Sequence, residues 1–189
     1  MSAEDPDQPD PAFYGLQKGI VVSRADPLGL ARVRVRIPGL IEEQSAWARP
    51  LFPGAGSRER GMHWVPEVGA EVGILFLQGD PDWPYYLGGD YGAPEGRSEV
   101  PVPAIDHGPD VRVMASKGWR IILDDREGNE TLKIEDKLGL CKIEIDGVTR
   151  RVLIHGTAAL MMDAVGPVDI RGLTITLNGR PVLPGGPIT

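Results

Sequence analysis

The sequence predicts an all-β protein made of two small units. Glycine and proline are both frequent, at 25 and 18 residues in a chain of 189, and both favour turns over long helices. Short runs that alternate apolar with polar residues recur along the chain, as in strands with one buried face. A stretch rich in proline and glycine, residues 92–110, separates two parts with different strand patterns, and we place the linker there.

Residues 1–13 are predicted to be a disordered acidic leader. MSAEDPDQPDP contains four acidic residues, no basic residue and no apolar run, so it has nothing to bury. This composition also excludes a secretory signal peptide, and no stretch of the chain approaches the ~18 apolar residues of a transmembrane helix. We therefore expect the protein to be made and kept in the cytoplasm, or to leave it by another route.

Residues 14–91 are predicted to form a small barrel of short, curved strands. Arg32, Arg34 and Arg36 alternate with apolar residues, so they share one face of a strand. Residues 72–77 form a nearly continuous apolar run, typical of a strand buried on both faces, and the following DWPYYLGG fits its hairpin partner. Glycine-rich bends between such strands favour a closed barrel of the OB type over a sandwich.

The aromatic residues of this barrel have two interpretations. A cluster of tryptophan and tyrosine can form a platform for a ligand, but in a small barrel its ordinary role is packing in the core or at an interface. We expect packing within the collar that the barrel forms, by Trp47, Phe76, Trp83 and Tyr85.

The three arginines resemble the basic face that an OB barrel offers to single-stranded nucleic acid. Residues 15–92, however, hold eight basic against nine acidic residues, and the whole chain has a net charge of -7. A chain of this charge repels the phosphate backbone. We expect no nucleic-acid binding and assign the arginines to solvated surface or to pairing between subunits, with a nucleic-acid-binding OB module as the alternative.

Residues 111–180 are predicted to form a ladder of short strands with one apolar face. Such a ladder has no covering helix and nothing within its own chain to pack against. Self-association can cover it, since three ladders wound about one axis bury every apolar face and leave few open edges. The residues expected to face this axis are Ile121, Leu123, Leu132, Ile134, Ile143, Ile145, Val152 and Ile154.

No motif predicts a catalytic or metal site. Cys141 is the single cysteine, which excludes an internal disulfide and a cysteine zinc cage. His63, His107 and His155 are isolated in the sequence. The densest carboxylates lack the spacing of a calcium loop, and catalytic pairs need a cleft that a ladder does not offer. These carboxylates are Asp124, Asp125, Glu127 and Glu130. We expect no enzyme activity, no cofactor and no metal.

Three specific stretches and a weaker fourth carry a resemblance to a known family. They are DPLGLARVRVRIPG (26–39), SAWARPLFPGAG (45–56), PEVGAEVGILFLQGDPDWPYYLGG (66–89) and, more weakly, GWRIILDDREGNETLKIEDKLG (118–139). In these stretches the chain resembles the baseplate spike proteins of contractile phage tails and related injection systems, known as baseplate assembly protein V and VgrG. The resemblance extends over roughly residues 15–180.

The resemblance implies a homotrimer with an OB-fold collar beneath a ring-shaped hub protein. It also implies an intertwined triple-stranded β-helix over residues 111–180, which leads the tube of a phage tail, bacteriocin-like particle or secretion system through the target cell envelope. Some members hold an iron ion at the tip through a His-x-His pair, which is absent here. We therefore expect no tip metal, a tail at residues 181–189, and a separate tip protein of the PAAR type. Some members carry a lysozyme or toxin domain. A spike with effector activity is a further alternative.

Overall fold

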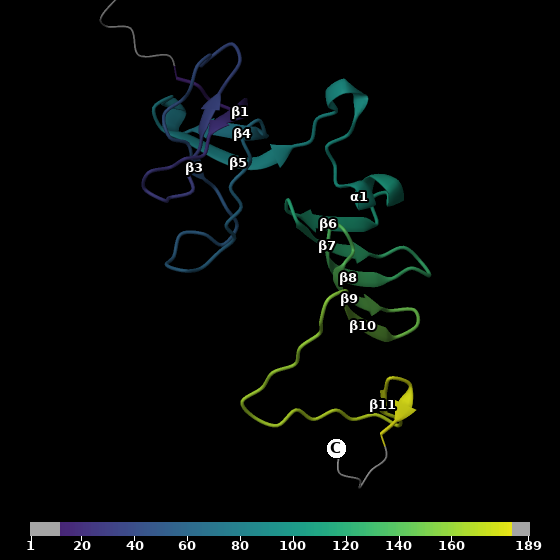
Figure 1. Cartoon of the computed structure of the whole chain (residues 1–189). Coiled ribbons are helices and arrows are strands. Elements are labelled where there is room, and N and C mark those ends of the chain that lie inside the picture. Colours follow the sequence, from purple (N-terminus) through teal and green to yellow (C-terminus); the bar gives the residue numbers. More distant parts are fainter. Residues whose placement is uncertain (1–11, 183–189) are drawn as a thin grey trace, which may run out of the picture. The chain divides into compact units, whose positions relative to one another are not determined.

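The computed structural model of the chain describes residues 12–182, and it confirms the all-β prediction (Figure 1). Two compact units divide the chain, with the boundary between Asp106 and His107. Each unit contains one five-stranded sheet. The smaller elements are the helix α1 (Val102–His107), the 3-10 turns η1 (Leu77–Gly79) and η2 (Pro94–Gly96), and a hairpin of β11 (Thr176–Leu177) and β12 (Arg180–Pro181).

The sheet of the first unit has the strand order β2-β1-β4-β5-β3. Its strands are β1 (Gln17–Ser23), β2 (Arg34–Arg36), β3 (Arg49–Pro50), β4 (Glu71–Phe76) and β5 (Pro84–Asp90). The short β3 pairs in parallel with β5, and the other neighbours are antiparallel. An isolated bridge joins Val33 to Ala48, so the chain beside β2 meets the chain beside β3. This bridge draws the two edges of the sheet together, as a barrel requires.

Alternation along the strands fills the core of the barrel. In β4, Val72, Ile74 and Phe76 are buried and the residues between them are only partly buried. The sequence predicted that this apolar run is buried on both faces, but only one face is buried in the core. A small barrel has a single interior, so the other face of the strand points outward. Gly19 lies opposite Val72 in β1, where a Cβ atom would stand 2.7 Å from Cγ1 of Ile74. The rest of the buried core consists of Val21, Val33, Val35, Ile37, Ala48 and Tyr86.

Asp26 fixes the loop between β1 and β2. Its carboxylate accepts hydrogen bonds from the backbone N–H groups of Leu28 (3.0 Å), Leu30 (2.8 Å) and Arg32 (3.2 Å). The Arg32 guanidinium also pairs with it at 2.5 Å. The bond from Arg32 is the main cause that lowers the pKa of Asp26, and the backbone donors add to it. The DPLGLAR stretch is therefore wrapped around one ionised carboxylate.

Tyr86 ties β5 to the chain that leads into β2. Its ring is buried in the core, and its hydroxyl donates a hydrogen bond to the carbonyl of Ala31 at 2.6 Å. Burial raises the pKa of Tyr86 to about 12. Ala31 has a φ of 59°, in the left-handed region that residues with a Cβ rarely adopt. The buried hydroxyl therefore holds a strained turn against the barrel.

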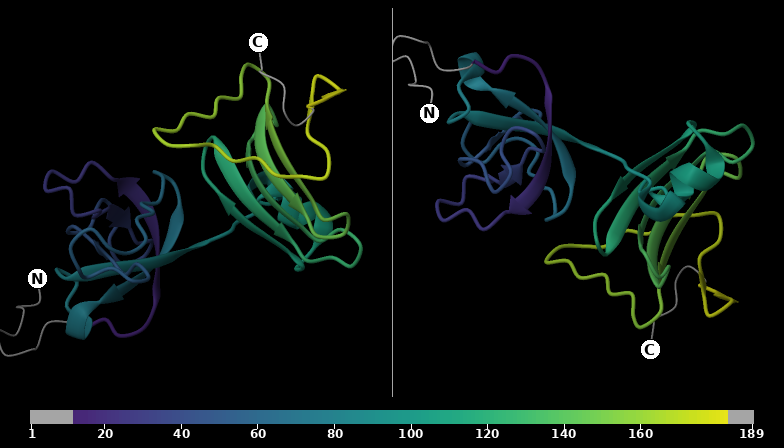
Figure 2. Two further views of the ribbon diagram at one scale, coloured as in Figure 1. Left: turned by 90° about the horizontal axis from the view of Figure 1, so that it is seen from below. Right: turned by 90° about the horizontal axis from the view of Figure 1, so that it is seen from above.

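The sheet of the second unit is an antiparallel meander with the order β10-β9-β8-β7-β6. Its strands are β6 (Val111–Ala115), β7 (Trp119–Asp124), β8 (Thr131–Asp136), β9 (Cys141–Asp146) and β10 (Arg151–Gly156). They lie side by side in both views of Figure 2. Residues 157–175 follow β10 and form neither a strand nor a helix. No helix within residues 12–182 is both long and apolar enough to cross a membrane.

We predict that Tyr86→Phe lowers the free energy of unfolding by about 1 kcal/mol, because the Ala31 carbonyl loses its donor. Because the pKa of Tyr86 is raised in the folded state, the free energy of unfolding also depends on pH. Stability from Tyr86 is fully present below pH ~10, where the unfolded tyrosine begins to ionise, and is lost as the pH rises toward 12. Urea unfolding at pH 8 and pH 11 should therefore show a larger alkaline loss for the wild type than for the variant. Equal stability of the two proteins at pH 8 would contradict this role of the hydroxyl.

Candidate assembly surface

One face of the second sheet is a continuous apolar surface made of two cross-strand rows. The register places Ile121, Ile134, Ile143 and Ile154 opposite one another in one row, and Leu123, Leu132, Ile145 and Val152 in the other. Met114 extends the first row onto β6. We call these nine residues the apolar face. The structure thus brings together all eight residues that the sequence pattern assigned to one side of the ladder.

The side chains of the apolar face are not covered by the described chain. Their exposed fractions are 36% at Leu132, 42% at Ile143 and 64% at Val152, and of the nine residues only Ile121 is half-buried. An antiparallel sheet usually packs one face on a core and leaves the other in water. A contiguous exposed apolar surface of this kind marks an interaction site.

The opposite face of the same sheet carries charged side chains, and they form ion pairs with one another. Arg120 pairs with Glu135 at 2.7 Å, and Glu144 pairs with Lys142 at 3.1 Å and with Arg151 at 3.3 Å. The hydrogen bond from Lys142 is the largest cause that lowers the pKa of Glu144. The two faces therefore differ in kind: one has its charges matched within the chain, and the other has an apolar surface that needs a partner.

The segment that follows β10 also exposes apolar side chains and unbonded backbone groups. Leu160, Met161, Val165 and Leu173 are exposed, the last two fully. Within the described chain, residues 158–174 make no backbone hydrogen bond to one another or to other segments. Extended chain with free backbone groups and exposed apolar side chains is completed by pairing with another strand.

The barrel residues predicted to pack lie in different environments. Phe76 is in the core, and Tyr85 is half-buried. Trp83 is 49% exposed, so it does not pack in the core. Pro84 and Tyr86 point inward, which turns the alternate residues of β5 outward. Tyr86 therefore occupies a core position, and Tyr85 lies half-buried on the other side of the strand.

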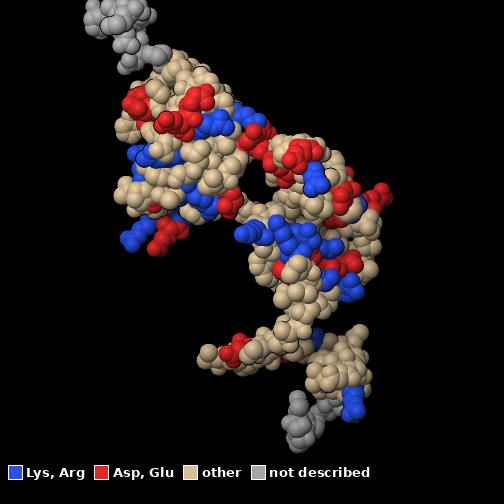
Figure 3. Space-filling view, turned by 45° about the horizontal axis from the view of Figure 1, so that its top comes forward, with Lys and Arg blue, Asp and Glu red and all other residues tan. Residues whose placement is uncertain are grey.

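Two tryptophans of the barrel, Trp47 and Trp83, lie against arginines. The ring centroid of Trp47 lies 4.7 Å from the guanidinium carbon of Arg34 and 5.3 Å from that of Arg32. The guanidinium carbon of Arg49 lies 5.5 Å from the ring centroid of Trp83. The bridge between the segments before β2 and β3 brings Trp47 and Arg34 together. Figure 3 shows basic side chains alongside acidic ones on the visible face of the barrel.

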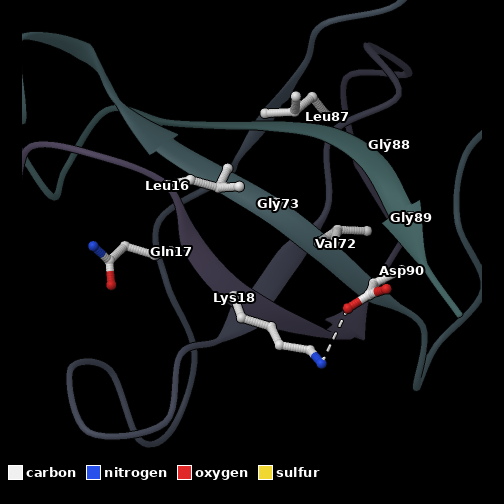
Figure 4. Close-up of a pocket in the computed structure, with 9 residues that line it drawn as sticks. All are labelled: Leu16, Gln17, Lys18, Val72, Gly73, Leu87, Gly88, Gly89 and Asp90. Atoms are coloured by element: carbon white, nitrogen blue, oxygen red, sulfur yellow. Dashed lines mark ion pairs between the residues drawn. The ribbon is translucent and has the colours of Figure 1, made fainter. Parts of the chain in front are cut away.

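A pocket of about 440 Å³ lies on the outer side of β1, β4 and β5 (Figure 4). Leu16 and Leu87 form apolar walls, and glycine backbone forms much of the rest. Lys18 at its margin pairs with Glu71 at 2.5 Å and with Asp90 at 3.3 Å, and the bond from Glu71 is the main cause that raises the pKa of Lys18. The charges at this pocket are already matched, so no group is set up for acid–base or nucleophilic chemistry.

Two carboxylates at the C-terminal end of β7 are bound to arginines. Asp124 pairs with Arg126 at 2.6 Å, which lowers the pKa of Asp124 to about 2, and Asp125 pairs with Arg112. No group of three or more His, Cys, Asp or Glu residues within residues 12–182 is placed to hold a metal ion. The structure therefore does not bring the isolated histidines and this carboxylate cluster together into a site.

Residues 17–91 match the family described as the type VI secretion system/phage-baseplate injector OB domain. The chain is also 32% identical, over 145 residues and 68% of its length, to the type VI secretion system spike proteins VgrG1a, VgrG1c and VgrG1b of Pseudomonas aeruginosa. It spans only about a fifth of these relatives, at 22%, 20% and 19% of their lengths. Residues 17–91 therefore belong to the family of injector OB domains, and these findings support a VgrG-like baseplate spike family for the chain.

Proposed function

We propose that this protein is a non-enzymatic subunit of the central spike of a contractile injection apparatus and acts as a homotrimer. Family membership supplies the baseplate and spike context. The observation that carries the trimer is the apolar face, which the chain itself leaves uncovered. A second copy of the same chain is the partner that is always present at the needed concentration.

Two features favour three copies wound about one axis over a flat pair. Two sheets packed face to face would cover the apolar face but would leave residues 158–174 with free backbone groups. In an intertwined triple-stranded β-helix over residues 111–180, this segment would pair with strands of the other two chains. The threefold arrangement would therefore cover the apolar side chains and also give the free backbone groups hydrogen-bond partners.

A shaft of this kind would suit the mechanical role. Cross-chain hydrogen bonds keep each chain from peeling away alone, so axial force is shared by three backbones. The charged face of the sheet, with its internal ion pairs, would lie outward and keep the shaft soluble. The proposed spike would lead the tube through the target cell envelope after assembly in the cytoplasm.

The remaining parts of the proposal follow the family resemblance. A hub protein would sit on the N-terminal side of the collar, and a PAAR-type protein would close the C-terminal tip. We keep residues 14–91 as the collar, 92–110 as the neck and 111–180 as the shaft. The unit boundary at Asp106 falls within this neck. Residues 183–189 of the tail and residues 1–11 of the acidic leader lie outside the described residues.

Sedimentation equilibrium of the purified chain tests the trimer. We expect a mass of three times 20.4 kDa and a complex that resists heat and SDS. A monomeric mass over the micromolar range would overturn the proposal. A stable dimer would overturn its threefold part.

Ile143→Asp should abolish association through the apolar face. The side chain is 42% exposed in the single chain, so an aspartate there is tolerated by the monomer. In the trimer it would bury three unpaired charges, each at a cost of several kcal/mol. His155→Asp is the matched control, because it adds the same charge to the opposite face, across from Lys142. A trimeric Ile143→Asp variant with unchanged melting would refute the assignment of this face.

Cys141 offers an independent report on the same face. It lies on the side of β9 that carries Ile143, and it is exposed in the single chain. The assembled protein should therefore react slowly with a thiol reagent, and the Ile143→Asp variant should react at least tenfold faster. Equal rates for the two proteins, with both correctly folded by circular dichroism, would count against burial of this face.

A further inference from the structure

The barrel has a second surface, which the spike proposal leaves unused. We call it the basic face and define it by Arg34, Arg36, Arg49, Trp47 and Trp83. Two of its arginines lie against indole rings, at 4.7 Å for Arg34 and 5.5 Å for Arg49. A guanidinium held against an aromatic ring loses rotational freedom and still presents its N–H groups outward. The basic face is therefore preorganised for anionic groups.

The arginines of the basic face have no carboxylate partner within residues 12–182. Three other basic side chains of the barrel are matched: Lys18 with Glu71, Arg24 with Glu67, and Arg32 with Asp26. Arg58 and Arg60 also form no ion pair with a described residue, but they lie in the exposed loop between β3 and β4 and not against an aromatic ring. The basic face is therefore an unmatched arginine group of which two members are held against indole rings, and such a group suits a ligand that carries the opposite charge.

The chemistry of the surface favours carboxylates over a nucleic acid. The indole of Trp47 already has two guanidinium groups against it, which reduces the free ring surface for stacking a base. A short carboxylate-rich peptide can contact the arginines without following a continuous path across the barrel.

We propose that the basic face binds the acidic leader of this chain, residues 1–11. The leader carries Glu4, Asp5, Asp7 and Asp10 and no basic side chain. Complementary charge therefore exists within the same polypeptide, in a segment with no apolar surface that could hold it elsewhere.

The attachment point of the leader supports this assignment. The described chain begins at Ala12, and the N–H group of Phe13 donates a hydrogen bond to the carbonyl of Gly79 at 2.8 Å. Gly79 ends η1, and the turn that follows it leads to Trp83, the ring against Arg49. Residues 1–11 span up to about 36 Å when extended, whereas a domain of ~100 residues has a radius of gyration of about 13 Å. The leader is therefore joined to the described chain next to the segment that leads to Trp83, and it is long enough to reach the basic face.

Peptide binding to the full-length chain tests the proposal. A variant with Glu4→Gln, Asp5→Asn, Asp7→Asn and Asp10→Asn removes the competing charges, and a labelled peptide MSAEDPDQPDP is added while its fluorescence anisotropy is measured. We expect binding that weakens as salt rises, and weaker binding to the wild-type chain, whose own leader competes. Adding Arg34→Gln and Arg49→Gln to the variant should reduce the affinity at least tenfold.

The matched control is Arg58→Gln with Arg60→Gln, which removes two arginines from the exposed loop between β3 and β4 and should leave the affinity within twofold. Three results would overturn the proposal: no binding at low salt, equal losses in the two double variants, or tighter binding of an oligothymidylate of equal charge. The basic face lies within one barrel, so the peptide should also bind an Ile143→Asp chain. Peptide binding and trimer formation can therefore fail separately.

Discussion

The uncovered apolar face of the β6–β10 sheet is the constraint on which the rest of this account depends. Two rows of isoleucine, leucine and valine lie in register across four strands, and the described chain places nothing over them. The opposite face has matched its own charges. A sheet with one exposed apolar face is unstable in water, which is why we propose that copies of this chain cover it.

The two units of the chain differ in whether they bury their apolar side chains within the described residues. The barrel curls its sheet until its own strands enclose a core, and polar groups such as the Asp26 carboxylate and the Tyr86 hydroxyl are satisfied by local bonds. The second sheet leaves its apolar face exposed within the described residues. In the proposed spike, the barrel would fold by itself and the second sheet would fold together with its copies.

The sequence could predict eight of the nine residues of the apolar face, all but Met114, and the barrel only in part. In TLKIED and CKIEID every second residue is apolar, and the period of a strand then decides which side chains share a face. In β5 the phase depends on the turn at Leu77–Gly79, where Gln78 has a φ of 57°, so Tyr85 and Tyr86 could not be told apart by pattern. The contact of Trp47 with Arg34 depends on a bridge between distant segments, which no local pattern encodes.

The number of chains is the central claim, and electron microscopy of the purified protein tests it most directly. Class averages should show a rod with a wider head, and end-on views should show threefold symmetry. Particles the size of a single 20.4 kDa chain, or twofold averages, would contradict the account.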